Sequence, residues 1–99
     1  MTYKLEFKKS ALKEWEKLGH TLKEQFKKKL KERLQNPHIP TASLAGGQNL
    51  YKIKLRQQGY RLVYSVSDEI VTVTVIAVGK RDRNAVYDIA LSRLNDNRP

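Results

Sequence analysis

Apolar and polar residues follow two different spacings in the first third of the chain. Residues 3–7 alternate apolar and polar side chains, which predicts a short first strand. The next segment carries apolar side chains at helical spacing, including Leu12 and Trp15. Ser10 stands where an N-cap is favoured and Gly19 where a C-terminal cap is favoured, so we expect the first helix between them.

A longer second helix is predicted from apolar residues that recur at every fourth position. They form one stripe, which consists of Leu22, Phe26, Leu30 and Leu34. Thr21 and Glu24 have the spacing of a capping box at its start. Pro37 ends it, because proline disfavours helical geometry at the residue before it. We expect the two helices to form an antiparallel hairpin.

Three more strands are predicted after a loop that is rich in proline, glycine and small residues. They lie near residues 50–56, 60–67 and 70–78. Residues 82–94 then have the spacing of a short helix, and residues 95–99 form a tail that we expect to fray. The predicted fold class is α+β: a four-stranded, mostly antiparallel twisted sheet, with the helical hairpin packed on one face and a short C-terminal helix.

The register of the predicted hairpins follows from the residues that must share a face. With a turn at Gln57–Gln58, Lys54 pairs with Arg61 and the apolar residues of both strands lie on one side. A slip by one residue would bury both cations against the helices. The second hairpin is predicted to pair Tyr64 with Val73, which brings the apolar residues of the last strand to the same side.

The opposite face of this sheet concentrates positive charge. It is predicted to carry Lys52, Lys54, Arg56 and Arg61, with Lys80, Arg81 and Arg83 closing it at the end of the last strand. Like charges directly across a strand pair are destabilising, and folding alone does not require them. Any one of these cations fits a solvated face that protects the sheet edge from aggregation. The whole set favours an anion site, since arginine forks match phosphate geometry.

Composition extends this charge pattern to the whole chain. The sequence of 99 residues is expected to form a single domain, 1–99, and it has a net charge of +10. Such an excess favours nucleic acid, an anionic membrane surface or an acidic protein as partner. The lysines of the second helix fit a solvated face better than a specific site, yet they would steer the protein toward a polyanion; they are Lys27, Lys28 and Lys31.

Other classes of function find little support in the sequence. The chain has no cysteine, and its carboxylates are scattered, whereas hard cations need clustered oxygens. We therefore expect neither a metal nor another cofactor. No signal peptide and no apolar stretch of membrane-spanning length is visible, so a cytoplasmic location without a membrane partner is expected. His38 lies in a loop without an acidic neighbour and is predicted to be a surface residue.

Tyr87 of the last helix has two readings from spacing alone. It has the spacing to pack beside Leu91 in the core, which is the favoured reading. It could instead face the basic surface and stack on a nucleic-acid base.

Three segments together resemble a known family. ALKEWEKLG, LYKIKLRQQGYRLVY and VIAVGKRDRNAVY are similar to the RelE family of bacterial toxin–antitoxin endoribonucleases, over nearly the whole chain. The resemblance implies a toxin that enters the A site of the 70S ribosome and cuts mRNA there. It also implies a cognate acidic, RelB-like antitoxin that keeps the toxin off the ribosome.

The same resemblance implies a set of catalytic residues, which are Lys52, Lys54, Arg61, Arg81 and Tyr87. Lys54 is expected to be the general base for the RNA 2′-hydroxyl, because crowded cations lower one another's pKa. Arg56, Lys80 and Arg83, with the helix lysines, are expected to bind RNA. Ala45 departs from relatives that carry a basic residue before the glycine, and this departure concerns one contact with ribosomal RNA.

Two other functions fit the same scaffold. One is a non-enzymatic toxin similar to ParE, which poisons DNA gyrase and generally lacks the full set of catalytic residues. The other is a basic RNA-binding module without activity. Incubation with translating ribosomes separates them, because only the endoribonuclease cleaves in the A site.

Overall fold

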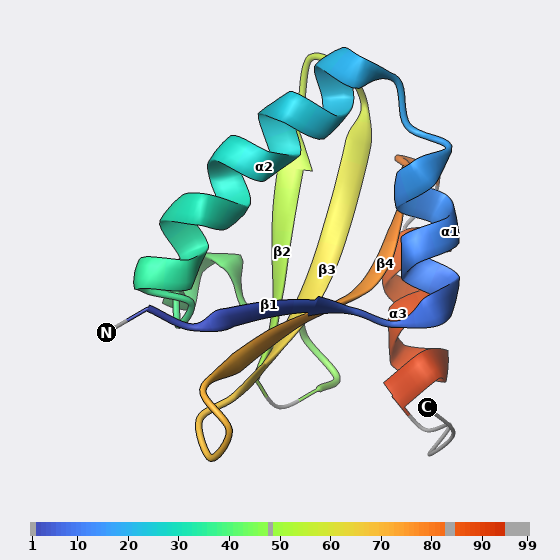
Figure 1. Cartoon of the computed structure of the whole chain (residues 1–99). Helices are drawn as coiled ribbons and strands as arrows, with labels where there is room; N and C mark the ends of the chain where they lie inside the picture. Colours follow the sequence, from blue (N-terminus) through green and yellow to red (C-terminus); the bar gives the residue numbers. More distant parts are fainter. Residues whose placement is uncertain (1, 48, 83–84, 95–99) are drawn as a thin grey trace.

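The computed structural model describes residues 2–47, 49–82 and 85–94 (Figure 1). Its elements, in chain order, are β1 (Lys4–Phe7), α1 (Lys9–Glu16), α2 (His20–Gln35), the 3₁₀ turn η1 (Pro40–Ala42), β2 (Leu50–Leu55), β3 (Tyr60–Ser67), β4 (Thr72–Lys80) and α3 (Ala85–Leu94). The described strands form a four-stranded sheet in the order β1-β4-β3-β2. β1 runs parallel to β4 and the other pairs are antiparallel, which confirms the predicted α+β class.

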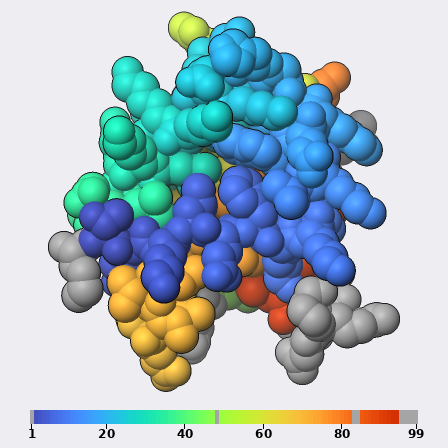
Figure 2. Space-filling view, in the orientation of Figure 1, coloured from blue at the N-terminus to red at the C-terminus, as the bar shows by residue number. Residues whose placement is uncertain are grey.

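Helices α1 and α2 cover one face of the sheet, with α1 against β4 and α2 against β2 (Figure 1). In the space-filling view they and β1 hide most of the strands beneath them (Figure 2). The rings of Trp15 and Phe26, 6.2 Å apart between centroids, join the two helices over the core. The predicted stripe on α2 is confirmed, since Phe26 and Leu30 are buried and Leu22 and Leu34 pack against them.

The predicted helix caps are wrong. Lys8 is the N-cap of α1, so Ser10 lies inside the helix. Gly19, in an extended conformation, is the N-cap of α2 and not a left-handed end of α1. Thr21 is therefore already within the first turn, and the capping box with Glu24 does not form at the predicted place. α1 begins directly after β1, and α2 begins shortly after α1. Burial of their apolar faces, and not a side-chain cap, determines these positions.

The first predicted hairpin register is confirmed. Lys54 pairs with Arg61 and Leu55 pairs with Tyr60. The turn is longer than the predicted pair of residues and runs through residues 56–59. Gly59 closes it at φ 70°, a left-handed conformation that glycine adopts without steric cost, and its amide donates to the Leu55 carbonyl at 2.9 Å.

The second predicted register is wrong for two reasons. The turn between β3 and β4 runs through residues 68–71 and is longer than predicted, so Tyr64 pairs with Val75 in place of Val73. A β-bulge then shifts the pairing of β3 with β4 further. Val63 pairs with Ala77 while the next residue, Tyr64, pairs with Val75, so Ile76 is an extra residue. As a result Ile76 and Ala77 face away from α1 and α2, and Ala77 does not join the predicted core.

This opposite face holds a second apolar cluster under α3. It contains Leu44, Leu50, Val63, Ile76, Ala77, Val86 and Ala90. The sheet is thus covered by α1 and α2 on one face and partly by α3 on the other. The basic residues of the β2–β3 hairpin lie on the part of the second face that α3 leaves open.

Two further predictions concern the C-terminal part of the chain and the membrane. Arg83 and the tail at residues 95–99, for which we predicted RNA binding and fraying, lie outside the described residues. Within the described part of the chain, no helix has both the length and the apolar character needed to cross a membrane.

Candidate nucleic-acid interface

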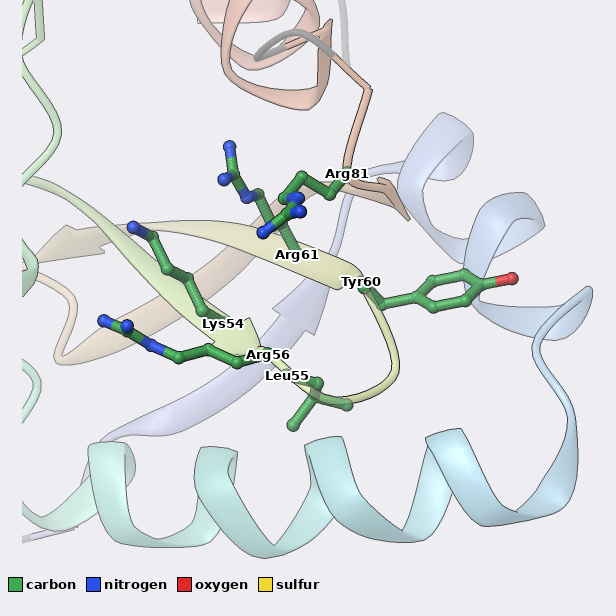
Figure 3. A pocket seen from close by; sticks show the side chains of 7 residues that line it. Lys54, Leu55, Arg56, Tyr60, Arg61 and Arg81 are labelled. Carbon is green, nitrogen blue, oxygen red and sulfur yellow. The ribbon is translucent and has the colours of Figure 1, made fainter.

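The β2–β3 hairpin places its cations on one side by simple strand alternation. Lys54 and Arg61 are cross-strand partners, so both side chains leave the sheet on the same face. Lys54, Arg56 and Arg61 project to one side of the hairpin, whereas Leu55 points toward α2 and Tyr60 toward α1 (Figure 3). The apolar residues on the helix side therefore hold the cations in position.

Arg81 reaches this face from the end of β4. Its backbone amide donates to the Gly59 carbonyl at 2.6 Å, which ties the strand end to the β2–β3 turn. The Arg81 side chain consequently extends over Arg61 (Figure 3). The strand end lies beside the hairpin, as the sequence predicted.

These cations line one cavity of about 290 Å³. Its lining residues are Lys54, Leu55, Arg56, Gly59, Tyr60, Arg61 and Arg81. Such a volume lies at the small end of ligand sites, which suits a phosphate with part of its sugar. Guanidinium forks and a lysine ammonium around one space can donate several charge-assisted hydrogen bonds to it.

Lys54 lies in a part of this cavity where its ammonium group is partly desolvated and close to other cations. Its pKa is lowered from 10.5, first by desolvation and then by the charges of Lys52, Arg61, Arg56 and Arg81. Desolvation and like charges both disfavour the protonated amine. Lys54 thus gives up its proton more readily than an isolated lysine, as a general base requires.

Tyr87 combines the two readings that spacing left open. It packs at the edge of the apolar cluster under α3, and its ring also faces the cations. The Arg61 Cζ lies 4.9 Å and the Lys52 Nζ 5.8 Å from the ring centroid, both within cation–π range. Burial raises the pKa of Tyr87, and the charge of Arg61 opposes this effect, so the phenol stays protonated at neutral pH. Its buried hydroxyl has no hydrogen-bond partner among the described residues.

Some predicted RNA-binding residues lie elsewhere. Lys80 pairs with Tyr60 and so leaves the sheet on the opposite side from Arg61. It lines a different cavity, which it shares with Glu14 and Ile89. Lys27 lies 3.5 Å from Glu24 in an exposed ion pair on α2.

A shallow groove connects α2 with the basic hairpin. It measures about 510 Å³ and is lined by Gln25, Lys28, Lys29, Lys54, Leu55, Arg56, Gln57 and Gln58. Lys28 therefore lies next to the basic face, whereas Lys31 is exposed and outside this groove. The sequence prediction missed Lys29 and Arg33, which lie one helical turn apart. That spacing alone does not distinguish them from the other cations of α2.

A polar network holds the loop before β2 against the β3–β4 turn. The His38 Nδ1 lies 2.9 Å from the Tyr51 hydroxyl, and the His38 Nε2 lies 2.8 Å from the Asp68 Oδ1. The Tyr3 hydroxyl donates to the same carboxylate at 2.6 Å. His38 was predicted to be a surface residue because its own segment holds no acidic partner; the fold supplies one from another segment, since it brings Asp68 to His38 from thirty residues away.

Metal-ligand side chains are not gathered in this region. Over the described ranges, no group of three or more His, Cys, Asp or Glu residues is placed to hold a metal ion.

Comparisons with known proteins define the class of this chain. A family model described as the ParE toxin of the type II toxin–antitoxin system parDE matches residues 5–85. The mRNA interferase toxin RelE of Escherichia coli K12 is 56% identical over 94 residues, which cover 95% of this chain and 99% of the relative. The chain therefore belongs to the RelE/ParE family of type II toxin–antitoxin toxins, and the predicted resemblance is confirmed.

Solved structures place it on the RelE side of that family. A mutant of the E. coli toxin RelE in the free state has a TM-score of 0.87 at 54% identity, over 95% of this chain and 99% of that chain. The toxin chain of the intact E. coli RelBE toxin–antitoxin complex has a TM-score of 0.79 at 58% identity, over 82% of this chain and 99% of that chain.

Proposed function

We propose that this protein is the toxin of a type II toxin–antitoxin system and that it cleaves mRNA in the ribosomal A site. The observation that carries the proposal is the basic cavity, where Lys54, Arg61 and Arg81 converge and the pKa of Lys54 is lowered. The similarity to a protein named mRNA interferase toxin RelE supports it.

The proposed chemistry uses the 2′-hydroxyl of the RNA as nucleophile. Lys54, supported by Lys52, takes the hydroxyl proton, and the oxygen attacks the adjacent phosphorus. The bond to the 5′-oxygen of the next nucleotide then breaks, and this oxygen takes up one proton from solvent, which leaves a 2′,3′-cyclic phosphate on one fragment and a 5′-hydroxyl on the other. Lys54 afterwards releases the proton of the 2′-hydroxyl to solvent. Neither a second nucleophile nor an oxidant or reductant is needed for this balance.

Arg61 and Arg81 are assigned to the charges that develop during this step. Arg61, which pairs with Lys54 across the two strands, would bind the non-bridging oxygens of the phosphorane. Arg81 would stabilise the leaving 5′-oxygen. Tyr87 would stack on a base and hold the Arg61 guanidinium through its ring face, which sets the in-line geometry.

Dependence on the ribosome follows from the weakness of these catalytic groups. A lysine is a modest base even with a lowered pKa, and a guanidinium is a poor acid because it remains protonated. The ribosome would hold the mRNA in a reactive shape and supply the missing orientation. The protein would therefore act in the bacterial cytoplasm, where mRNA is translated.

The proposed partner in the resting state is an acidic, RelB-like antitoxin. A similar toxin forms a RelBE complex, and the net charge of +10 provides an attractive field for an acidic chain. Complementary charge would speed the capture of the toxin.

A ParE-like, non-enzymatic toxin is the second candidate, because the matching family model is described as ParE. Translating ribosomes decide between the two. Purified protein should cleave mRNA within the A-site codon, mapped by primer extension, and should leave naked RNA largely intact. Cleavage that is absent on ribosomes, with gyrase inhibited instead, would establish the ParE-like function.

A further inference from the structure

A second basic cavity adjoins the proposed cleavage site. It measures about 310 Å³ and is lined by Arg33, Thr41, Ala42, Lys52, Lys54 and Arg56. It shares Lys54 and Arg56 with the first cavity, whereas Arg61 and Arg81 line only the first. Two cation-lined spaces therefore meet at the Lys54–Arg56 segment of β2.

Arg33 is held in this cavity by the protein itself. Its Nη1 donates to the Tyr64 hydroxyl at 2.9 Å and to the Lys52 carbonyl at 3.3 Å. The Tyr64 hydroxyl donates onward to the Pro37 carbonyl at 2.8 Å, so the acceptor of Arg33 is also fixed. The Arg33 guanidinium is consequently preorganised beside β2 and does not need to be ordered by a ligand.

The remaining donors of Arg33 make it suitable for binding an anion. Both of these hydrogen bonds leave from Nη1, while a guanidinium carries five N–H donors on three nitrogens. Arg33 can hold the strand and donate to a phosphate at the same time. Thr41 adds a hydroxyl to the wall, and every charged residue that lines this cavity is basic.

We propose that this second cavity binds a phosphate neighbouring the scissile one on the same RNA strand, with Arg33 as its main contact. The identity of the ligand rests on the proposed function. A strand that crosses the shared Lys54–Arg56 wall would place successive phosphates in the two cavities. Binding energy gained at the second phosphate would then help to hold the scissile bond in line. Arg33 is thus a binding residue and takes no part in proton transfer.

The continuity of the two cavities favours RNA over an acidic protein segment. An acidic peptide would have to fill both spaces with carboxylates at the spacing of the cations, whereas a nucleic-acid backbone carries regularly repeated phosphates. An acidic antitoxin segment remains an outcome that the experiment must be able to reveal.

The test is fluorescence anisotropy with a six-nucleotide single-stranded RNA that carries 2′-O-methyl groups, which block cleavage. Arg33→Gln should weaken binding about tenfold, the size of one charge-assisted hydrogen bond. It should also reduce the slope of log affinity against log salt by about 0.7, as expected for one lost phosphate contact. Lys13→Gln, which removes one exposed charge from α1, should change affinity less than about twofold.

A second variant separates direct contact from support of the fold. Tyr64→Phe removes the hydroxyl that Arg33 contacts but keeps the cation. It should retain RNA affinity within about twofold, because the binding charge remains. An equal loss in Tyr64→Phe and Arg33→Gln would show that Arg33 acts only through the scaffold, and it would overturn the proposal.

A scan with neutral methylphosphonate linkages locates the phosphate. At one linkage the wild-type protein should lose affinity, whereas Arg33→Gln should lose nothing further; losses that add at every linkage would contradict the subsite. The subsite is also wrong if Arg33→Gln binds RNA as Lys13→Gln does, if the wild type does not bind the RNA, or if Arg33→Gln weakens only an acidic peptide. This binding assay contains no ribosome, so it is independent of the cleavage assay. If the protein cleaves mRNA on ribosomes but the losses from Arg33→Gln and from the linkages simply add, only the subsite is rejected. If the losses do not add at one linkage but no cleavage occurs, only the enzymatic function is rejected.

Discussion

At Lys54 and Arg61, two like charges stand directly across a strand pair, an arrangement that ordinarily destabilises a sheet. They stay there because Ile53 and Leu62 fix the register from the other face, where both are buried. The lowered pKa of Lys54 reflects desolvation and this crowding together. Folding alone therefore does not account for a lysine opposite an arginine at this position.

Replacement of Lys54 by alanine should leave thermal stability unchanged or slightly higher. The folded state disfavours the protonated amine, so the advantage of Lys54→Ala should be full below the folded pKa of Lys54. The advantage should shrink as pH rises through that value toward 10.5, the ordinary value. Thermal unfolding of both proteins between neutral and alkaline pH measures this effect. A clear loss of stability in Lys54→Ala at neutral pH would contradict it.

Replacement of Arg56 by alanine should shift the pH dependence of cleavage to higher pH. Arg56 is one of the charges that lower the pKa of Lys54, and its removal should raise that pKa. The neutral amine then becomes available only at higher pH. Single-turnover cleavage on saturating ribosomes, measured against pH for wild type, Arg56→Ala and Lys13→Gln, provides the comparison. A profile for Arg56→Ala that overlays the wild type would exclude Lys54 as the titrating base.

The elements of the fold differ in how far the sequence determines them. The β2–β3 register was predictable, because a slip would bury Lys54 and Arg61. The bulge at Ile76 was not. Four apolar residues in succession, Val75 to Val78, show that both faces of β4 are buried, but not which residue is extra. That bulge is what turns Ile76 and Ala77 toward α3.

Helix ends and the extended site were the other limits of sequence analysis. A cap contributes about 1 kcal/mol, less than the burial of Trp15 or Phe26, so burial decides where α1 and α2 begin. The charge of the cavity between Lys54, Arg61 and Arg81 was predictable from strand alternation on β2 and β3 and from the position of Arg81 at the end of β4. Lys29 and Arg33 were not distinguishable within a helix full of cations, because only the packing of α2 on β2 selects the turn that faces the hairpin.

The core between sheet and helices should be sensitive to truncation. Leu62 is fully buried on β3, so Leu62→Ala should lower the free energy of unfolding by about 2–5 kcal/mol through lost burial and a cavity. Ile70, 63% exposed in the β3–β4 turn, is the control, and Ile70→Ala should stay within about 0.5 kcal/mol. Denaturant unfolding measures both. Equal losses in the two variants would show that Leu62 is not part of a packed core.

The polar network of His38, Asp68 and Tyr3, which holds the loop before β2 against the β3–β4 turn, should be sensitive to acid. Two hydrogen bonds lower the pKa of Asp68 below 3.8, the larger effect coming from His38 and the smaller from Tyr3. Asp68 therefore stabilises the fold above pH 3.8, and this contribution disappears as pH falls through the lower folded value.

The difference in melting temperature between wild type and Asp68→Asn should accordingly be largest near neutral pH and vanish in strong acid. Glu69→Gln, which removes the same charge one residue along the turn, is the matched control. If the difference in melting temperature between wild type and Asp68→Asn is the same at all pH values, the Asp68 carboxylate does not stabilise the polar network.

Over the whole molecule, the sheet separates the helices that cover the main core from the basic residues of the β2–β3 hairpin. One face carries α1 and α2 (Figure 2), while the open part of the other face carries the basic hairpin, with Arg81 and Tyr87 at its edge. The net charge of +10 adds a long-range attraction for polyanions. The proposed mechanism uses this cationic surface to bind an RNA that supplies its own nucleophile.

The measurement that tests this account most directly is single-turnover mRNA cleavage by Lys54→Ala, with ribosome binding measured in parallel. The account predicts that the variant still binds programmed ribosomes with an affinity within about tenfold of the wild type, since one phosphate contact is lost. Its cleavage rate at saturation should nevertheless fall by about 10²-fold or more, as expected when a general base is removed. If cleavage at saturation remains near the wild-type rate, or falls only as binding falls, Lys54 is an electrostatic anchor and the proposed mechanism is wrong.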